Sequence, residues 1–582
     1  MWNSAERYLH YDPLPGASAL GPITGSGSIG GKAKGLVFAH AALSAVARQT
    51  FPGGFAPDDI AGVIEIPPVH FIADGVFAEF LAINHLPLPG IEPLDEETKS
   101  RFQDAHFPGW LDPVLASIVT EMDFPLAVRS SSRLEDSPHA SFAGKYLTVF
   151  LSNTGPVEAR VHALAEAIRQ VYASAYSPDA TEHRRRHDLD GDAMAVIVQK
   201  LAGRARGRYF YPELAGVGHS RNYRRWTERI AVEDGVMRVV FGLGTRSTGR
   251  GYARVICPAH PRLRPEGQDP GAVARYAQEI VDVLDLETGA TCSLNINEEP
   301  ALAFATSGGP GYLQIYDAGR KELRSARGDP VLSPREKYVF TFPTLERGAR
   351  LVIDATSYLF RLLEARMDTP VDLEFAAEPG DSRYYLIQAR PLWSWEEYRP
   401  VHVPAGEKGV ILRGNRMLTN GERTARWLVV VDPASYASTV DKHAVARAVG
   451  NLNRKLSGER YILVGPGRWG STSPGLGVPV RYGEISNCGV LVELGTVAGD
   501  FTPEFSWGTH FFADLEQDGI LYMPVIDGAP GNLVDWQYFS SGAGMSSISG
   551  HPAVRVFQGD FVVYMDAGRP EGVVIDRGSH PV

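Results

Sequence analysis

The sequence predicts a protein of the mixed α/β class, because strand-like and helix-like segments alternate along the whole chain of 582 residues. Short apolar runs rich in β-branched residues, such as residues 193–201, predict buried strands. Longer segments with apolar residues three and four apart, such as residues 156–176, predict amphipathic helices. A chain of this length has room for two to four domains, each with a hydrophobic core.

Composition narrows the function classes. The chain has 57 Lys and Arg against 68 Asp and Glu, a formal net charge of −11, which argues against nucleic acid as the main partner. Its three cysteines, Cys257, Cys292 and Cys488, are widely spaced and predict neither a disulfide framework nor a zinc knuckle. The N-terminus lacks a signal-peptide pattern, and no apolar run is long enough to cross a membrane. We therefore expect a cytoplasmic protein; no feature of the sequence sets its oligomeric state.

Residues 25–35, Gly-Ser-Gly-Ser-Ile-Gly-Gly-Lys-Ala-Lys-Gly, place a glycine-rich turn at the start of a predicted helix. The glycines match the G-x-G-x-x-G spacing, but no buried strand precedes them, so a dinucleotide-binding motif is rejected. A Walker loop is rejected too, because neither Ser nor Thr follows Lys32. Backbone N–H groups at a helix N-terminus favour an anion, so Lys32 is a candidate phosphate ligand. The alternative is a flexible turn with a solvated lysine.

Residues 125–150 combine groups that packing does not require. Arg129 and three serines follow an apolar strand, the acidic pair Glu135 and Asp136 comes next, and Phe-Ala-Gly precedes a second apolar run. We expect this stretch to hold the phosphates of a nucleotide.

Two further loops carry polar groups. Phe241–Gly251 combines a strand, the glycines Gly242 and Gly244, and two arginines, of which Arg246 is the first; such a loop can approach a polyphosphate closely. Residues 188–192, Asp-Leu-Asp-Gly-Asp, predict a turn rather than a calcium loop, because the glycine is in the fourth position and not the sixth. The basic segment before it, residues 182–188, is interpreted as a solvated helix end.

Residues 371–392 predict a β-hairpin with Pro-Gly-Asp at its turn. Residues two apart share a strand face, so Asp372 and Glu374 point the same way, as do Gln388 and Arg390. A carboxylate and an amide oxygen that face each other across a hairpin form a site of hard oxygen ligands suited to Mg²⁺. Arg390 could bind a phosphate nearby. The alternative is a surface hairpin with cross-strand ion pairs.

Taken in order, these motifs resemble the N-terminal nucleotide-binding region of phosphoenolpyruvate synthase and pyruvate phosphate dikinase. The matching residues are Gly30-Gly31-Lys32 with Leu36, Ala127 to Ser131 with Glu135 and Ala140 to Gly144, Gly242-Leu243-Gly244, and Asp372 to Phe375 with Ile387 to Pro391. The resemblance covers residues 20–392 and implies an ATP-grasp fold that uses ATP and Mg²⁺.

The resemblance also implies roles for individual residues. Lys32 and Arg129 would contact the ATP phosphates, with the neighbouring serines as hydrogen-bond donors, and Glu135 with Asp136 would orient the arginine or cap the next segment of the chain. The loop from Ser137 to Gly144 would close over the triphosphate. Glu374 and Gln388 would bind Mg²⁺, and Arg390 would stabilise the charge of the phosphoryl group in transfer. Gly242, Gly244 and Arg246 would contact the nucleotide, although Thr245, which precedes Arg246, stands where a glutamate is frequent in the family.

The last third of the chain departs from that family. We predict a nucleotide-binding domain over residues 1–392, a linker at 393–409 and a smaller α/β domain over 410–582. The last domain lacks the phosphohistidine motif and is shorter than the roughly 250 residues of a (β/α)₈ barrel. It contains a glycine-rich turn around Arg468 that can cradle an anion, and a Gly-Thr-His sequence ending at His510.

We expect Arg468 to face the ATP phosphates and His510 to act as phosphoryl acceptor or as an acid–base group, with His551 as the second candidate. The alternatives are a partly buried histidine and an arginine stacked on Trp469. The leading hypothesis is a dikinase-like, ATP- and Mg²⁺-dependent phosphotransferase that acts on a small-molecule or protein acceptor. An ATP-grasp ligase, and a nucleotide-sensing subunit whose phosphocarrier lies on another chain, are the competing hypotheses.

Overall fold

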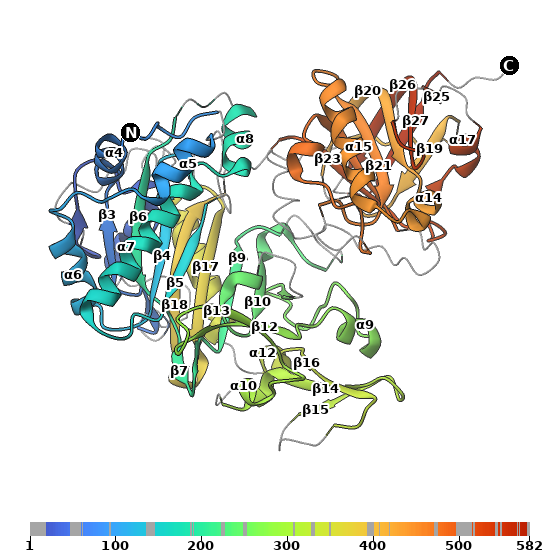
Figure 1. The fold of residues 1–582 in the computed structure, drawn as a ribbon. Helices are drawn as coiled ribbons and strands as arrows, with labels where there is room; N and C mark the ends of the chain where they lie inside the picture. The colour runs from blue at the N-terminus through green and yellow to red at the C-terminus, as the bar shows by residue number, and fades with distance from the viewer. Residues whose placement is uncertain are drawn as a thin grey trace. The chain divides into compact units, whose positions relative to one another are not determined.

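The computed structural model divides the chain into two compact units, Met1–Trp393 and Ser394–Val582 (Figure 1). It describes residues 19–46, 60, 62–91, 95–135, 146–186, 189, 191–222, 227, 229–247, 253–305, 309–326, 332–347, 351–392, 401–406, 408–417, 419–470, 475–495, 515, 518–541, 545–546, 550–566, 569 and 571–578. Both units mix helices and strands, which confirms the predicted α/β class. Among the helices described, none is both long and apolar enough to span a bilayer.

The first sheet of the N-terminal unit has the strand order β1-β3-β6-β4-β5. Its strands are β1 (Ile23–Thr24), β3 (Val69–Ile72), β6 (Met194–Lys200), β4 (Leu126–Ser132) and β5 (Thr148–Leu151). One face packs against α2 (Gly30–Val46), and the other packs on a core shared with α4 (Asp74–Ile83), α6 (Asp112–Glu121) and α7 (Val157–Ser174). Because both faces are covered, β4 is buried at every position, and its apolar run does not alternate with polar residues.

The helix predicted from residue 30 is confirmed as α2, with Leu36, Ala39 and Ala42 buried. Gly30 begins this helix with φ +78°, and a Cβ atom there would lie 1.7 Å from the Ser131 carbonyl oxygen. Only glycine fits so close an approach. The N-terminus of α2 is therefore held directly against the end of β4.

The second sheet of this unit has the order β11-β10-β9-β17-β18-β2. Its strands are β11 (Arg254–Ile256), β10 (Val236–Val240), β9 (Leu214–His219), β17 (Val371–Glu378), β18 (Arg383–Pro391) and β2 (Ile64–Glu65). Helix α13 (Leu351–Met367) packs against it. The predicted hairpin is confirmed as β17 and β18, joined through the short helix η3 (Pro379–Asp381) and a left-handed Ser382 at φ 55°.

Two smaller sheets complete the N-terminal unit, with orders β13-β12-β8-β7 and β15-β14-β16. The strands are β13 (Thr291–Asn295), β12 (Ile280–Asp285), β8 (Tyr209–Tyr211), β7 (Arg204–Arg206), β15 (Glu322–Ser325), β14 (Leu313–Asp317) and β16 (Glu336–Phe340). The remaining helices of the unit are α5 (Glu96–Gln103), α8 (Pro178–Arg186), α9 (Pro270–Arg275), α10 (Ala301–Phe304), α11 (Gly309–Tyr312), α12 (Pro343–Arg347), η1 (Val232–Asp234) and η2 (Gly244–Arg246).

The C-terminal unit is built on one sheet with the order β23-β22-β21-β20-β26-β27-β19-β24, and β25 pairs with β26. The strands are β23 (Leu521–Val525), β22 (Cys488–Leu494), β21 (Tyr461–Pro466), β20 (Gly421–Val431), β26 (Val554–Asp566), β27 (Glu571–Asp576), β19 (Val410–Gly414), β24 (Leu533–Val534) and β25 (Met545–Ser546). The first four are parallel to one another, and the others are antiparallel to their neighbours. The helices are α14 (Pro433–Ser438), α15 (Lys442–Lys455), α17 (Trp536–Ser540) and η4 (Tyr482–Glu484). Separate apolar cores cover the two faces.

The interpretation of residues 182–188 as a solvated helix end is wrong for His183 and Arg184. His183 and Arg184, on α8, are buried, and Arg184 is fully so. The Arg184 guanidinium donates to the carbonyl oxygens of Gly90 at 3.0 Å and Ala175 at 2.6 Å. Two carbonyl groups, one in a loop and one at the C-terminal end of α7, thus satisfy its N–H groups inside the protein.

Candidate functional site

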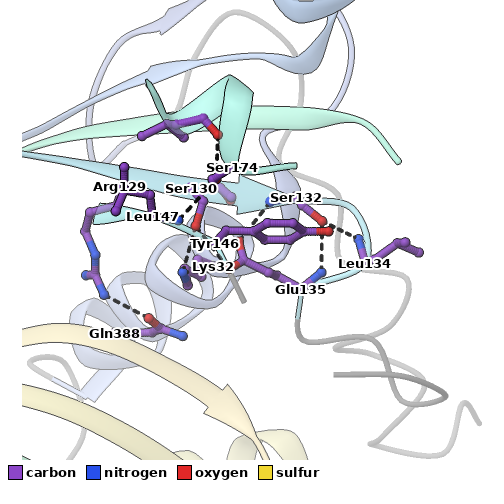
Figure 2. Close-up of polar contacts among 12 residues, drawn as sticks. Lys32, Arg129, Ser130, Ser132, Leu134, Glu135, Tyr146, Leu147, Ser174 and Gln388 are labelled. Atoms are coloured by element: carbon purple, nitrogen blue, oxygen red, sulfur yellow. Dashed lines mark hydrogen bonds and ion pairs between the residues drawn. The ribbon is translucent and has the colours of Figure 1, made fainter. Parts of the chain in front are cut away.

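Arg129 connects the two large sheets of the N-terminal unit. It lies on β4, and its guanidinium reaches β18, where it donates to the Ile387 carbonyl oxygen at 2.8 Å and to Gln388 Oε1 at 2.9 Å (Figure 2). It also forms an ion pair and hydrogen bond with Glu374 on β17. Its side chain is only 7% exposed, whereas that of Glu374 is 41% exposed. The predicted phosphate ligand and the two predicted metal ligands therefore meet.

An irregularity in the hairpin creates part of this arrangement. Glu374 pairs with Gln388 and Phe375 with Leu386, so Ile387 is an extra residue on β18. Such a β-bulge interrupts the ladder and re-aims the groups around it. The carbonyl oxygen of Ile387 is the one that accepts from Arg129.

The hairpin also fixes Arg390. The register places Arg390 opposite Asp372 and Gln388 opposite Glu374, which confirms the predicted pairing of the two faces. Arg390 donates to Asp372 Oδ2 through Nε at 2.8 Å and through a terminal nitrogen at 2.5 Å. Asp372 is buried, so this ion pair holds the guanidinium of Arg390 in one orientation. The sequence predicts the face of β17 on which Asp372 lies, but not this role for it.

Lys32 lies in the first turn of α2 with its ammonium group buried against β4. Its Nζ donates to Ser130 Oγ at 3.0 Å and forms an ion pair with Glu135 Oε1 at 2.7 Å (Figure 2). An ammonium group has three N–H donors, so its contacts with the described residues leave one for a ligand. Glu135 is therefore the partner of the lysine, not an orienting group for Arg129.

The three serines after Arg129 do not supply phosphate ligands, contrary to the prediction. All three are completely buried, and each hydroxyl bonds to the protein. Ser130 contacts Lys32 and Glu135, Ser131 donates to the Ile29 carbonyl oxygen at 2.7 Å, and Ser132 donates to Asp192. Their hydroxyls hold α2, β4 and β6 together beneath the two cationic side chains.

Gln199 was missed at the sequence level. It lies on β6, is 1% exposed, and accepts from Arg129 through Oε1 at 3.3 Å. Its Nε2 has no hydrogen-bond partner among the residues that the structure describes. A buried donor without a partner is costly, and here it lies beside Arg129, which makes Gln199 a candidate ligand for a bound oxygen group. The sequence does contain a feature that could have indicated Gln199, because this single glutamine interrupts an apolar strand.

The Gly-Leu-Gly turn, residues 242–244, follows β10 of the second sheet and contacts β12 of the adjacent smaller sheet. Gly242 has φ +89°, and Leu243 donates its amide to the Asp282 carbonyl oxygen at 2.9 Å. Arg246 donates through Nε to Asp282 Oδ1 at 2.8 Å and through a terminal nitrogen to Ser293 Oγ at 2.9 Å. Its side chain is 27% exposed. Arg246 is thus anchored to β12 and β13, and its contact with the nucleotide stays a prediction.

Several predicted residues lie outside the described part of the chain. These are Ser137 and Gly144 in the proposed closing loop, His510, and most of the linker at 393–409. His551 is described, and its Nδ1 accepts from the Ala553 amide at 3.1 Å, a local turn contact.

The turn around Arg468 does not offer its backbone to an anion. The four amides of residues 467–470 all donate within the C-terminal unit, to the carbonyl oxygens of Leu494, Leu476 and Val478 and to the side chain of Glu493. The expected cradle of backbone N–H groups is therefore wrong for these four residues, because their donors are already used. The Arg468 side chain, which is half-buried, remains the candidate anion ligand.

The donor set at the hairpin fits Mg²⁺ held together with phosphate groups. Glu374 and Gln388 contribute one carboxylate and one amide oxygen, and both are hard ligands. Mg²⁺ usually takes one or two protein ligands in nucleotide sites and completes its shell with phosphates and water. In the described residues, no group of three or more His, Cys, Asp or Glu side chains could hold a metal without such help.

The fold and these residues define an α/β nucleotide-binding domain, with buried cations beside a hairpin of oxygen ligands. The family model described as the AMP/ATP-binding domain of pyruvate phosphate dikinase matches residues 27–408, which is more than half of the chain. The chain therefore belongs to this family.

Three curated relatives are similar to this chain at low sequence identity. Phosphoenolpyruvate synthase from Deinococcus radiodurans is 28% identical over 410 residues, which cover 69% of this chain and 42% of that protein. Phosphoenolpyruvate synthase from Aeropyrum pernix is 26% identical over 322 residues, 52% of this chain and 33% of that protein. Rifampicin phosphotransferase from Streptomyces sviceus is 25% identical over 268 residues, 46% of this chain and 23% of that protein. The chain spans less than half the length of each of these relatives.

Proposed function

We propose that this chain is an ATP- and Mg²⁺-dependent phosphotransferase with an ATP-grasp type of nucleotide site. The observation that carries the proposal is the position of Arg129, whose guanidinium contacts both Glu374 and Gln388. In such an arrangement the arginine can bind phosphate oxygens while the carboxylate and the amide oxygen bind Mg²⁺. The negative charge of a triphosphate is then balanced by the arginine and the metal together. The relatives named as phosphoenolpyruvate synthase and rifampicin phosphotransferase support phosphoryl transfer as the reaction class.

Each residue of the site would have a separate task. Arg129 and the free N–H of Lys32 bind phosphate oxygens, and Gln199 donates from Nε2 to another. Glu374 and Gln388 hold Mg²⁺, which neutralises phosphate charge and orients the triphosphate when bound. Arg390, held by Asp372, stabilises the charge that develops on the transferred phosphoryl group. Catalysis of this kind depends on positioning and electrostatics rather than on a covalent step by a side chain.

The proposed phosphoryl acceptor is either a residue of the C-terminal unit or a small molecule or protein that binds to this unit. Arg468 and His510 are the residues proposed to act there. The closing loop with Ser137 and Gly144, and the nucleotide contacts of Gly242, Gly244 and Arg246, belong to the same proposal.

Incubation of the protein with ATP and Mg²⁺, followed by chromatography of the nucleotides, tests the proposal. AMP with phosphate supports dikinase-like transfer, and ADP indicates a simple kinase or a ligase. Addition of candidate carboxylates and amines then separates ligation from phosphoryl transfer. Unchanged ATP with measurable binding would favour a nucleotide-sensing subunit instead. Arg390→Lys serves as the control: it keeps the charge but loses the paired contact with Asp372, so any true turnover should fall.

A further inference from the structure

A buried chain of hydrogen bonds continues behind Lys32. Glu135, which pairs with Lys32 through Oε1, accepts the Ser132 amide at 3.0 Å through Oε2. The Ser132 hydroxyl accepts the amides of Leu134 at 2.9 Å and Glu135 at 3.2 Å, and so forms a tight turn at the end of β4. The turn fixes the Glu135 carboxylate, and the carboxylate in turn fixes the lysine.

Asp192, two residues before β6, supports that turn. The Ser132 hydroxyl donates to both oxygens of Asp192, at 3.0 and 2.8 Å. The same carboxylate accepts from the Tyr146 hydroxyl and from the Ala193 amide, the latter at 2.8 Å. Asp192 and Tyr146 are both 8% exposed. The buried carboxylate of Asp192 thus joins Ser132, at the end of β4, to Tyr146.

We propose that Asp192 is a positioning residue for Lys32, which acts through Ser132 and Glu135. When its carboxylate is removed, the Ser132 hydroxyl loses its acceptor and rotates, and the turn that orients Glu135 loosens. Lys32 then keeps its charge but loses its fixed direction. The proposal rests on the proposed function in so far as Lys32 binds a phosphate group.

The surroundings of Asp192 set the pH range for a test. The groups that act on it are Tyr146, Ser132, the Ala193 amide and, from α8, Arg184, whose guanidinium donates to the Tyr146 hydroxyl at 3.4 Å. Glu135 acts on Tyr146. Burial raises the pKa of Asp192 to about 6, although its hydrogen bonds and Arg184 oppose the rise. Near pH 7.5 the carboxylate is ionised and accepts all its bonds, and near pH 5 it is protonated.

The matched control lies in the C-terminal unit. Asp576 is also buried, at 6% exposed, and it accepts from a tyrosine hydroxyl, that of Tyr538, at 2.9 Å. Asp576→Asn and Asp192→Asn therefore make the same chemical change in similar surroundings. Only the second variant alters a residue linked to Lys32.

Two measurements test the proposal on the whole chain of 582 residues. The first is the acylation rate of Lys32 without nucleotide, followed by mass spectrometry, which reports the freedom of the amine independently of ATP. We expect Asp192→Ala to raise that rate several-fold. The second is the Kd of Mg-ATP by calorimetry, which we expect to rise about tenfold, the equivalent of one lost hydrogen bond. Asp192→Asn carries no charge at any pH and so resembles the protonated carboxyl group. At pH 7.5 it should bind Mg-ATP as weakly as the native protein does at pH 5, and its Kd should lack the part of the change between pH 7.5 and 5 that comes from Asp192.

An unchanged acylation rate of Lys32 in Asp192→Ala would overturn the proposal. So would a change of that rate in Asp576→Asn as large as the change in Asp192→Asn. If Asp192→Ala does not fold, Asp192→Asn decides: a pH dependence of Lys32 acylation identical to that of the native protein refutes the role. A native protein that binds no ATP would refute the proposed function, while the acylation rates would still decide whether Asp192 positions Lys32.

Discussion

Replacement of Arg129 by alanine should weaken both nucleotide binding and the N-terminal unit itself. The guanidinium donates to four acceptors, of which Gln199 Oε1 and Gln388 Oε1 belong to side chains that are 1% and 3% exposed. Each buried acceptor left without a donor costs about 1–3 kcal/mol, and the Ile387 carbonyl oxygen adds a third. The Glu374 side chain is exposed enough for water to solvate it, so the loss of its partner adds little to this cost. We expect a loss of about 3–5 kcal/mol in the free energy of unfolding.

The two effects are separated by two assays. Hydrogen exchange followed by mass spectrometry should show lost protection in peptides from β4 and β18, with strands of the C-terminal unit as the internal reference. Calorimetry should show a Kd for Mg-ATP raised tenfold or more, since a hydrogen bond to a charged group contributes about 1.5–3 kcal/mol. Arg160→Ala is the matched control, because Arg160 is an arginine of the same unit whose side chain is only 10% exposed and contacts Asn153 and Val119. It should lose stability but keep its ATP affinity. Native affinity in Arg129→Ala would refute the assignment.

Further predictions concern the metal ligand, the missed glutamine, a buried acid and the C-terminal unit. Glu374→Gln should abolish turnover at ordinary Mg²⁺ concentrations without unfolding the protein, and activity across a Mg²⁺ titration checks this. Gln199→Leu should raise the Kd for ATP several-fold, because it removes a donor that the protein leaves unused; calorimetry measures it. Asp192 has a pKa of about 6 in the folded state against 3.8 for the free side chain, so its contribution to stability falls by about 3 kcal/mol as the pH rises from 4 to above 6. Denaturation of Asp192→Asn at several pH values should lack that fall. Arg468→Ala should lower net turnover but preserve the melting temperature within a few degrees, and a preserved rate would remove Arg468 from the mechanism.

The sequence predicted those parts of the site that depend on short-range geometry. Strand alternation placed Glu374 and Gln388 on facing positions of one hairpin, and the glycine pair before Lys32 marked the start of a helix. These features are local, so a few neighbouring residues determine them.

The remaining features depend on contacts between distant segments. Arg129 and Gln388 are 259 positions apart, and no local pattern indicates that their side chains meet. The β-bulge at Ile387 arises from pairing between strands and was not visible either. The serines after Arg129 were misassigned because a small hydroxyl side chain fits equally well on a phosphate and inside a buried turn. Arg184 was misassigned for a similar reason, since a basic run predicts a solvated helix unless neighbouring carbonyl groups enclose it.

The charge arrangement explains why the site should take a nucleotide together with a divalent cation. In the described structure, three of the candidate cations already have a carboxylate partner: Lys32 pairs with Glu135, Arg129 with Glu374, and Arg390 with Asp372. The three pairs sum to no net charge. A free triphosphate would therefore meet three carboxylates as well as three cations, and little net attraction. In the proposed function, Mg²⁺ would supply the missing positive charge. Its ligation by Glu374 and Gln388 would draw that carboxylate away from Arg129 and free the guanidinium for a phosphate oxygen. On this reasoning the ion pairs hold the cations in place until Mg²⁺ and the nucleotide arrive together.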